Sequence, residues 1–333
     1  MNETRSMDSR RPTLTAGRVA RELATIMVKL AVSLTMISLV VFILTALPGS
    51  PARDILGMYA LPSQIAAFNR AHGLDAPVMT RYWHWLDGIF HGNWGTSYES
   101  NGPVWALIEP ALKHSLVLVV VSWAVAVVVG VPLGLFAGAR LRGRRDTALS
   151  VATVTLAALP EFTVALVLII VVAVELRWLP VDSTALDDAG VFSSPSAYVL
   201  PAATIALAII PYLVRLTRAN AREVVSEPFV RSAVLRGITE PALTLRYVLP
   251  NAAPPVINAV GLQLAGLVGG VVVAESVFGF PGVGSLLVQA AGSRDIPVVE
   301  ALVLLIGCAF VVVNVLADLV VRLVTPRLRD VAR

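Results

Sequence analysis

The chain has 333 residues, of which 56% are hydrophobic and 14% are charged, and its mean hydropathy is +0.78. Soluble domains carry roughly 25% charged residues, so this chain has too few charges to cover a water-facing surface of its size, and a soluble enzyme is excluded. Its 26 Lys and Arg residues outnumber its 22 Asp and Glu residues, and their placement decides what that excess means.

Long apolar runs predict six transmembrane helices and an all-α integral membrane protein. At about 1.5 Å per residue, each run covers most or all of a ~30 Å hydrocarbon layer. The runs are 30–47, 115–139, 147–174, 198–214, 252–274 and 301–324. The first is interpreted as an uncleaved helix, because its basic tail and apolar stretch are both longer than those of a secretory signal. Six crossings place both termini on one side of the membrane.

These runs divide the chain into consecutive parts. In order, they are a basic cytoplasmic tail (1–23), a first transmembrane helix (24–47), an extracytoplasmic insert (48–113), a five-helix core (114–324) that includes a cytoplasmic loop (215–250), and a cytoplasmic tail (325–333). Four of the six tryptophans lie in the insert, and tryptophan favours the membrane–water interface. We therefore expect the insert to form a small subdomain that rests on the membrane surface.

Two features of the runs themselves predict local structure. Gly130, Gly134 and Gly138 recur every four residues and form one small face suited to close helix packing; the fifth run is also rich in glycine. Glu161 interrupts the third run directly after Pro160, which favours a kink. A charge in the bilayer centre costs at least ~2.5 kcal/mol, so Glu161 should face the bundle, a partner subunit or a wet cavity, either in a substrate path or as a structural carboxylate.

The cytoplasmic loop carries two helix-start signals, Ser226-Glu227-Pro228 and Thr239-Glu240-Pro241. In each, a hydroxyl can cap the helix and a carboxylate lies at the positive end of the helix dipole. Proline occupies a position where its missing backbone N–H breaks no helical hydrogen bond. Gly237 then ends the first helix, which predicts a helix over 228–236. A helix of that length is not stable alone in water, so it either docks into a partner or lies on the cytoplasmic leaflet.

The positive residues test the topology independently of hydropathy. Twenty of the 26 lie on the face that carries both termini, and six lie on the opposite face. Because cytoplasmic loops are enriched in Lys and Arg, both termini are predicted to be cytoplasmic. The basic balance is thus explained by membrane orientation, and we predict no nucleic-acid partner.

The loop also contains Phe229-Val-Arg-Ser-Ala-Val-Leu-Arg-Gly237, followed after nine residues by Tyr247-Val-Leu-Pro250. This segment resembles the permease loop of ATP-binding-cassette (ABC) importers, whose pattern is E-A-A-x-x-x-G-x9-I-x-L-P. Here Arg231-Ser-Ala233 stands where E-A-A is commonest, and Tyr247 stands for the isoleucine.

Further segments resemble the oligopeptide/dipeptide/nickel branch of these permeases, the type with a large extracytoplasmic insert after the first helix. They are Pro48-Gly-Ser-Pro51, Gly73-Leu-Asp-Ala-Pro77, Arg81-Tyr82, Trp94-Gly-Thr-Ser97, Glu275-Ser-Val-Phe-Gly-Phe-Pro-Gly-Val-Gly284, Arg294-Asp-Ile-Pro297, Asn314-x3-Asp318 and Pro326-Arg-Leu-Arg329. The family usually has Asp before the last proline, where this chain has Thr325.

The resemblance implies a type I ABC importer permease fold in a bacterial cytoplasmic (inner) membrane. It implies a second homologous permease subunit, two ATP-binding subunits and an extracytoplasmic substrate-binding protein that delivers short peptides. Neither lysine lies in a Gly-x4-Gly-Lys-Ser/Thr motif, so the chain is not expected to be an enzyme or to hold a cofactor, and ATP and Mg are expected in the partner ATPases. The alternatives are import of nickel or another small solute, or an ion-gradient secondary transporter.

The resemblance also assigns candidate sites. The helix that docks on the ATPase, the coupling helix, is expected to use Pro228, Phe229, Arg231, Ser232, Ala233, Arg236 and Gly237. Glu161 and Glu275 are candidate pathway or gate residues; for Glu275 a structural role in a gate-side loop and contact with the delivering protein are both open. The histidines His72, His84, His91 and His114 have no helical ligand spacing and no cysteine partners, so we predict no metal site and place them at the outer surface.

Overall fold

The computed structural model describes residues 16–47, 49–140, 143–186 and 193–324. The tail expected at 325–333 and most of the tail expected at 1–23 lie outside the described residues. Within the described ranges the regular elements are helices, with one isolated bridge between Thr96 and Pro103. This agrees with the predicted all-α class.

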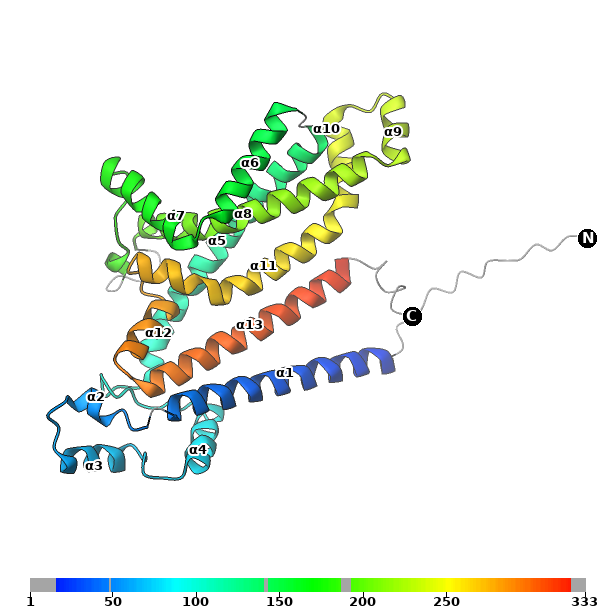
Figure 1. The fold of residues 1–333 in the computed structure, drawn as a ribbon. Helices are drawn as coiled ribbons and strands as arrows, with labels where there is room; N and C mark the ends of the chain where they lie inside the picture. Colours follow the sequence, from blue (N-terminus) through cyan, green and yellow to red (C-terminus); the bar gives the residue numbers. More distant parts are fainter. Residues whose placement is uncertain (1–15, 48, 141–142, 187–192, 325–333) are drawn as a thin grey trace, which may run out of the picture.

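The described helices follow one another as labelled in Figure 1. Their bounds are α1 (Ala16–Ala46), α2 (Ala52–Leu56), α3 (Pro62–Ala71), α4 (Val78–Phe90), α5 (Val104–Arg140), α6 (Arg144–Ala158), α7 (Glu161–Leu168), π-helix η1 (Ile169–Glu175), 3-10 helix η2 (Thr184–Leu186), α8 (Pro195–Val225), α9 (Pro228–Leu235), α10 (Glu240–Leu243), π-helix η3 (Thr244–Val248), α11 (Leu249–Val277), α12 (Val283–Gly292) and α13 (Ile296–Val324).

In the described part of the chain, four helices, α1, α5, α8 and α13, are long and apolar enough to cross a membrane. Two bent pairs raise this number to six if each counts as one crossing. The first pair, α6 with α7 and η1, bends by 103°. Both Leu159 (ψ 129°) and Pro160 (ψ 144°) have extended backbone, which a residue before proline favours. The kink expected at Pro160 is therefore a sharp corner between two arms.

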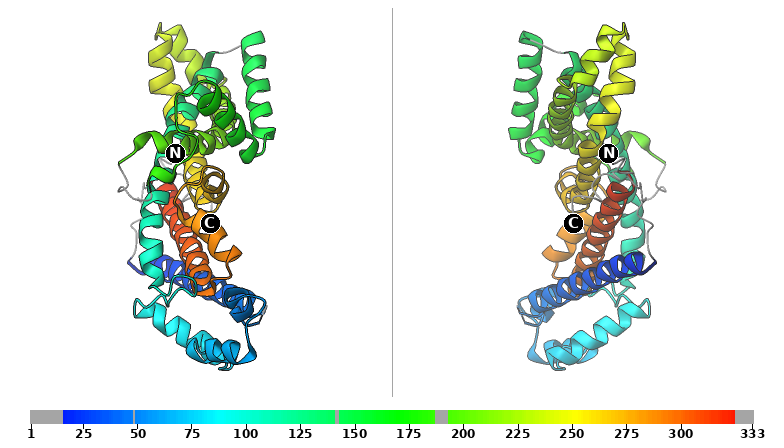
Figure 2. Two further views of the ribbon diagram at one scale, coloured as in Figure 1. Left: turned by 90° about the vertical axis from the view of Figure 1, so that its left-hand side faces the viewer. Right: turned by 90° about the vertical axis from the view of Figure 1, so that its right-hand side faces the viewer.

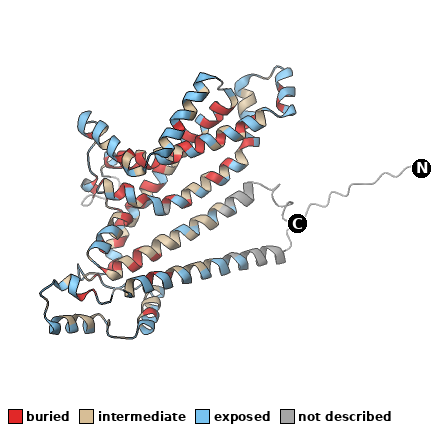
Figure 3. Cartoon of the chain, viewed as in Figure 1, coloured by how far each residue is buried: buried red, intermediate tan, exposed pale blue. Residues whose placement is uncertain are grey.

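The centre of the bundle is α8, which packs against α5, α6, α7 and α11. The glycine face predicted on the second run makes the closest of these contacts. A Cβ added at Gly134 would lie 2.6 Å from the Val214 carbonyl oxygen, and one at Gly138 would lie 2.6 Å from the Arg218 carbonyl oxygen. Figure 3 shows buried residues gathered in this region, whereas α1 is largely exposed. The predicted packing face is thus confirmed.

The insert and the loop that is predicted to be cytoplasmic lie at opposite ends of the molecule (Figure 2). Helices α2, α3 and α4 lie at the C-terminal end of α1, and α9 and α10 lie at the C-terminal end of α8. Helix α5 begins at Val104, so the boundary that we expected between the insert and the core, at 113/114, falls inside this helix. Its first turns carry polar residues, including a Glu109–Lys113 ion pair (2.7 Å), which hydropathy does not detect as part of a span.

Candidate functional site

The candidate coupling helix is α9, which runs from Pro228 to Leu235 and is separated from the end of α8 by two residues. Glu227, not Ser226, occupies the N-cap position, with the extended backbone (ψ 144°) of a residue before proline. The Ser226 hydroxyl instead donates to the Arg222 carbonyl (3.0 Å) at the end of α8. The predicted Ser226 cap is therefore wrong. Thr239 does hold the cap position of α10, but its hydroxyl makes no capping hydrogen bond.

Gly237 ends α9 as predicted. Its φ is +76°, a left-handed conformation that costs side-chain-bearing residues about 1–2 kcal/mol. The Gly237 N–H donates to the Val234 carbonyl (2.9 Å), and the Ile238 N–H donates to the Ala233 carbonyl (3.3 Å). These two bonds form a Schellman motif. They turn the chain away from α9 and toward α10.

The two faces of α9 differ in exposure. Val230 and Ala233 are buried (2% and 0% exposed) and face the rest of the protein, whereas Leu235 is 88% exposed. Six of the seven predicted docking residues are exposed, namely Pro228, Phe229, Arg231, Ser232, Arg236 and Gly237. Ala233 is the exception, because it lies on the inner face. Val234 and Leu235, which sequence reasoning left out of the site, extend its apolar surface.

The Tyr247-Val-Leu-Pro250 part of the motif anchors the loop to the bundle. Val248 is buried in a cluster with Leu135 of α5 and Ala221 of α8. The Leu249 N–H donates to the Thr244 carbonyl, five residues back, and Pro250 has no N–H to offer. The chain therefore enters α11 through the π-helical segment η3.

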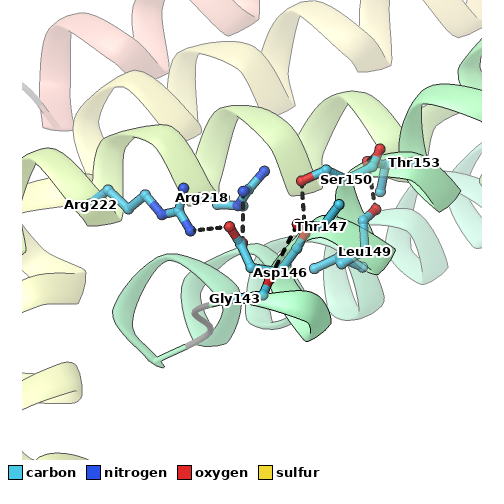
Figure 4. Close-up of polar contacts among 8 residues, drawn as sticks. All are labelled: Gly143, Asp146, Thr147, Leu149, Ser150, Thr153, Arg218 and Arg222. Atoms are coloured by element: carbon cyan, nitrogen blue, oxygen red, sulfur yellow. Dashed lines mark hydrogen bonds and ion pairs between the residues drawn. The ribbon is translucent and has the colours of Figure 1, made fainter.

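An ion-pair clamp joins the first turn of α6 to the last turns of α8 (Figure 4). One carboxylate oxygen of Asp146 lies 2.7 Å from Arg218 Nη2, and the other lies 2.6 Å from Arg222 Nη2. The Asp146 and Arg218 side chains are only 16% and 17% exposed, so water screens this pair weakly. Sequence reasoning missed the clamp, although an acidic residue directly after a run of arginines was a signal.

Glu275, a candidate gate residue, is fully buried where α11, α12 and α5 meet. Its carboxylate accepts hydrogen bonds from the Ser115 hydroxyl (2.5 Å) and from the N–H groups of Gly284 (2.6 Å) and Ser285 (3.2 Å). It therefore sits at the N-terminus of α12, where the helix dipole favours negative charge. A Cβ at Gly282 would overlap this carboxylate. The geometry supports the structural alternative for Glu275.

Glu161 is the first residue of α7, at the corner of the bent pair. It is half-buried, and its Oε1 atom has no hydrogen-bond partner among the described residues. Its role in a substrate path stays a prediction.

The Trp94-Gly-Thr-Ser97 and Arg294-Asp-Ile-Pro297 motifs, which are far apart in sequence, meet at Asp295. This buried carboxylate accepts hydrogen bonds from the Ser97 hydroxyl and from the Tyr98 N–H (3.0 Å). Arg294 pairs with Asp54 of α2 (2.8 Å). Burial and the nearby carboxylates of Glu300 and Asp295 raise the pKa of Tyr98 to about 12. The insert is therefore tied to the corner between α12 and α13.

The whole pattern matches a known family. Residues 130–330 match the model described as binding-protein-dependent transport system inner membrane component, and residues 19–119 match the model for the N-terminal part of such membrane components. The chain belongs to this family of ABC importer permeases. The matches support the oligopeptide/dipeptide type, as the resemblance implied.

Named relatives of this permease cover nearly its whole length. It is 33% identical over 297 residues to the probable peptide ABC transporter permease protein y4tP of Sinorhizobium fredii, and 34% identical over 299 residues to the glutathione transport system permease protein GsiC of Escherichia coli K12; each alignment covers 89% of this chain and 95% of the relative. An inward-facing structure of the MetNI methionine ABC transporter aligns with a TM-score of 0.52 and 19% identity over 64% of this chain and 93% of that one. The last match shows the fold, a type I ABC importer permease.

The permease also has an apolar cavity of about 220 Å³ between α5, α8 and α11. Its one polar lining residue is Thr217, whose hydroxyl has no hydrogen-bond partner among the described residues. Glu161 and Glu275 do not line it. The remaining lining residues are Val127, Val131, Leu135, Leu249, Ala252, Ala253, Val256, Ile257 and Val260.

The histidines of the permease do not share one environment. His84 and His91 are exposed, and the His72 ring contacts that of Phe68 in a tilted arrangement with ring centroids 4.2 Å apart. His114, however, is buried in the bundle, with its Nδ1 atom 2.8 Å from the Tyr198 hydroxyl. The expected outer-surface position of His114 is therefore wrong, because it lies on a packed face of α5.

Proposed function

We propose that this permease is one of two homologous transmembrane subunits of an ATP-driven importer, and that the pair forms a passage for short peptides delivered by an extracytoplasmic binding protein. The family match and the names of the peptide and glutathione relatives support this proposal. Both termini would then be cytoplasmic in the inner membrane. ATP and Mg would be bound by two separate ATPase subunits, and this chain would need no cofactor of its own.

The observation that carries the proposal is the exposed face of α9. Phe229, Val234 and Leu235 present apolar surface at the tip of a polar loop, and Arg231 and Arg236 lie exposed on the same short helix. An amphipathic helix of this kind fits a groove in a partner protein. We therefore assign α9 as the surface on which an ATPase subunit docks.

The clamp offers a route by which movement of α9 reaches the bundle. Helix α9 follows α8 after two residues, and Arg218 and Arg222 on the last turns of α8 hold Asp146 of α6. A displacement of the α9 end of α8 would therefore carry the first turn of α6 with it. Rigid helices joined by such contacts are the usual elements of a two-state switch.

Purification of the tagged chain in mild detergent tests the assignment. Wild type is expected to retain two ATP-binding subunits, a second permease and a binding protein. Leu235→Asp places a charge on the exposed end of α9 and is expected to lose the ATP-binding subunits while keeping the second permease. Leu61→Asp, at an exposed leucine of the insert, is the matched control and should keep the ATPases.

Two outcomes would contradict the proposal. Recovery of the chain alone, with uptake driven by an ion gradient, would exclude ATP-driven import. Selective binding of a nickel chelate by the copurified binding protein, with no affinity for short peptides, would exclude the peptide substrate and leave the importer class standing.

A further inference from the structure

Helix α4 of the insert is strongly amphipathic. At 100° per residue, its apolar residues form two adjoining stripes. An inner stripe contains Tyr82, Trp85 and Ile89, and an outer stripe contains Met79, Trp83, Leu86 and Phe90. The opposite arc is polar and contains Thr80, Arg81, His84, Asp87 and His91.

The inner stripe packs against α1. Tyr82 is buried and meets Phe42 edge to face, with ring centroids 5.3 Å apart, and Trp85 lies 5.8 Å from the same ring. The Tyr82 and Ser38 hydroxyls are hydrogen-bonded at 2.9 Å. This contact sets where α4 lies along α1.

The contact lies within the transmembrane span and not beyond its end. Ser38 and Phe42 belong to the apolar segment Met27–Ala46. Ser38 precedes Ala46 by eight residues, which is about 12 Å of helix, and Phe42 precedes it by about 6 Å. Helix α4 therefore lies beside the outer part of α1 (Figure 1), at the depth of the outer leaflet.

Three of the four residues of the outer stripe are exposed, and Leu86 is half-buried. Met79 is 63% exposed, Trp83 is 59% exposed and Phe90 is 80% exposed. On α1, the apolar residues Leu39, Ile43 and Leu44 are exposed as well. These residues belong to the same apolar segment as Ser38 and Phe42, so exposed apolar side chains of α1 and α4 lie at the level of the span.

We propose that α4 is an interfacial helix whose outer stripe lies at the boundary of headgroups and acyl chains in the outer leaflet. A helix with one wide apolar face and one polar face binds membranes in this way, and tryptophan is enriched at that level. The polar arc, with His84, Asp87 and His91 exposed, faces water. The bilayer is thus the partner that sets the level of the insert, which is partly embedded and does not merely rest on the surface.

Site-directed spin labelling tests the position of α4 without any measurement of transport. A negative result would therefore overturn the interfacial helix and leave the proposed function standing. Single cysteines replace Trp83 or Phe90, with His84→Cys as the control on the polar arc, in the full chain carrying Cys308→Ala and purified with its partners into lipid nanodiscs. The ratio of oxygen to nickel-chelate accessibility is expected to be several-fold higher for Trp83→Cys and Phe90→Cys than for His84→Cys. If Trp83→Cys fails to accumulate, Met79→Cys carries the same test.

Two results would overturn the proposal. Equal access of the nickel chelate to both arcs would place the outer stripe in water. Exclusion of both reagents from the outer stripe in the complex, but not in the chain purified alone, would show that a partner protein covers it.

Discussion

Glu275 joins three helices through one buried carboxylate, and its replacement tests that junction. Glu275→Ala leaves the Ser115 hydroxyl and the N–H groups of Gly284 and Ser285 without their acceptor. Each buried polar group left unsatisfied costs about 1–3 kcal/mol, so the unfolding midpoint in detergent should fall clearly. Glu275→Gln keeps one carbonyl acceptor and should lose less. A wild-type midpoint for the alanine variant would contradict this structural role.

The matched control for Glu275 is its neighbour Ser276. The exposed Ser276 hydroxyl donates to the Val272 carbonyl of its own helix (2.8 Å). Ser276→Ala should therefore leave the midpoint close to that of wild type.

Gly237 is needed for its backbone conformation and not for space. A Cβ there would meet no atom within 4 Å, but its φ is +76°. Gly237→Val should strain the turn by about 1–2 kcal/mol, displace α9 and lower uptake at equal membrane abundance. Gly237→Asn is the control, since asparagine tolerates this conformation, and it should retain most uptake. Full uptake by the valine variant would show that the turn does not position the docking helix.

Residue identity allowed some of these roles to be predicted and not others. The requirement for glycine after α9 is local, so Gly237 was assigned correctly. Two features depend on how α9 packs on its neighbours. They are the burial of Ala233 and the position of Glu227, and not Ser226, at the N-cap. That packing is not visible in a stretch of nine residues.

At the scale of helices, the clamp between α6 and α8 gives a direct prediction. Asp146→Asn removes the carboxylate that Arg218 and Arg222 share, so the largely buried Arg218 loses the charge with which it is paired. We expect a loss of about 1–3 kcal/mol, measured as a lower unfolding midpoint, together with reduced uptake at equal abundance. Asp146→Glu keeps the charge and should recover part of both.

Arg145 provides the control for the clamp. It is an exposed cation one residue before Asp146, and Arg145→Gln changes the loop charge by the same amount in the opposite sense. It should leave stability and uptake near wild type. If Arg145→Gln lowered stability and uptake as much as Asp146→Asn, loss of any charged side chain at this turn, and not the specific pairing, would explain the effect.

The existence of the long helices could be predicted, but their shapes could not. Apolar length located α1, α5, α8 and α13, because a bilayer imposes a minimum span. It did not show that α5 begins at Val104 or that the third run turns by 103° at Pro160. Hydropathy measures length and composition, whereas the direction of each arm depends on the helices it packs against.

At the scale of the whole molecule, the two ends should lie on opposite sides of the membrane. Asn101→Cys in the insert and Leu235→Cys on α9 place exposed thiols at these ends, in a chain carrying Cys308→Ala. A membrane-impermeant maleimide should label Asn101→Cys in intact cells and Leu235→Cys only after the membrane is opened. Labelling of Leu235→Cys from outside would reverse the orientation predicted from the positive residues.

The sequence by itself determined the membrane location, the helical class, the predicted orientation and the coupling-loop motif. Hydropathy, charge bias and the conformational demands of glycine and proline are properties of short segments, so they can be seen without a fold. Only the tertiary structure decided that Asp146 meets Arg218 and Arg222, that Asp295 holds the Ser97 loop, and that α4 lies beside α1 with one apolar stripe largely exposed. Each of these depends on the mutual placement of helices distant in sequence, which is set by side-chain packing across the whole chain.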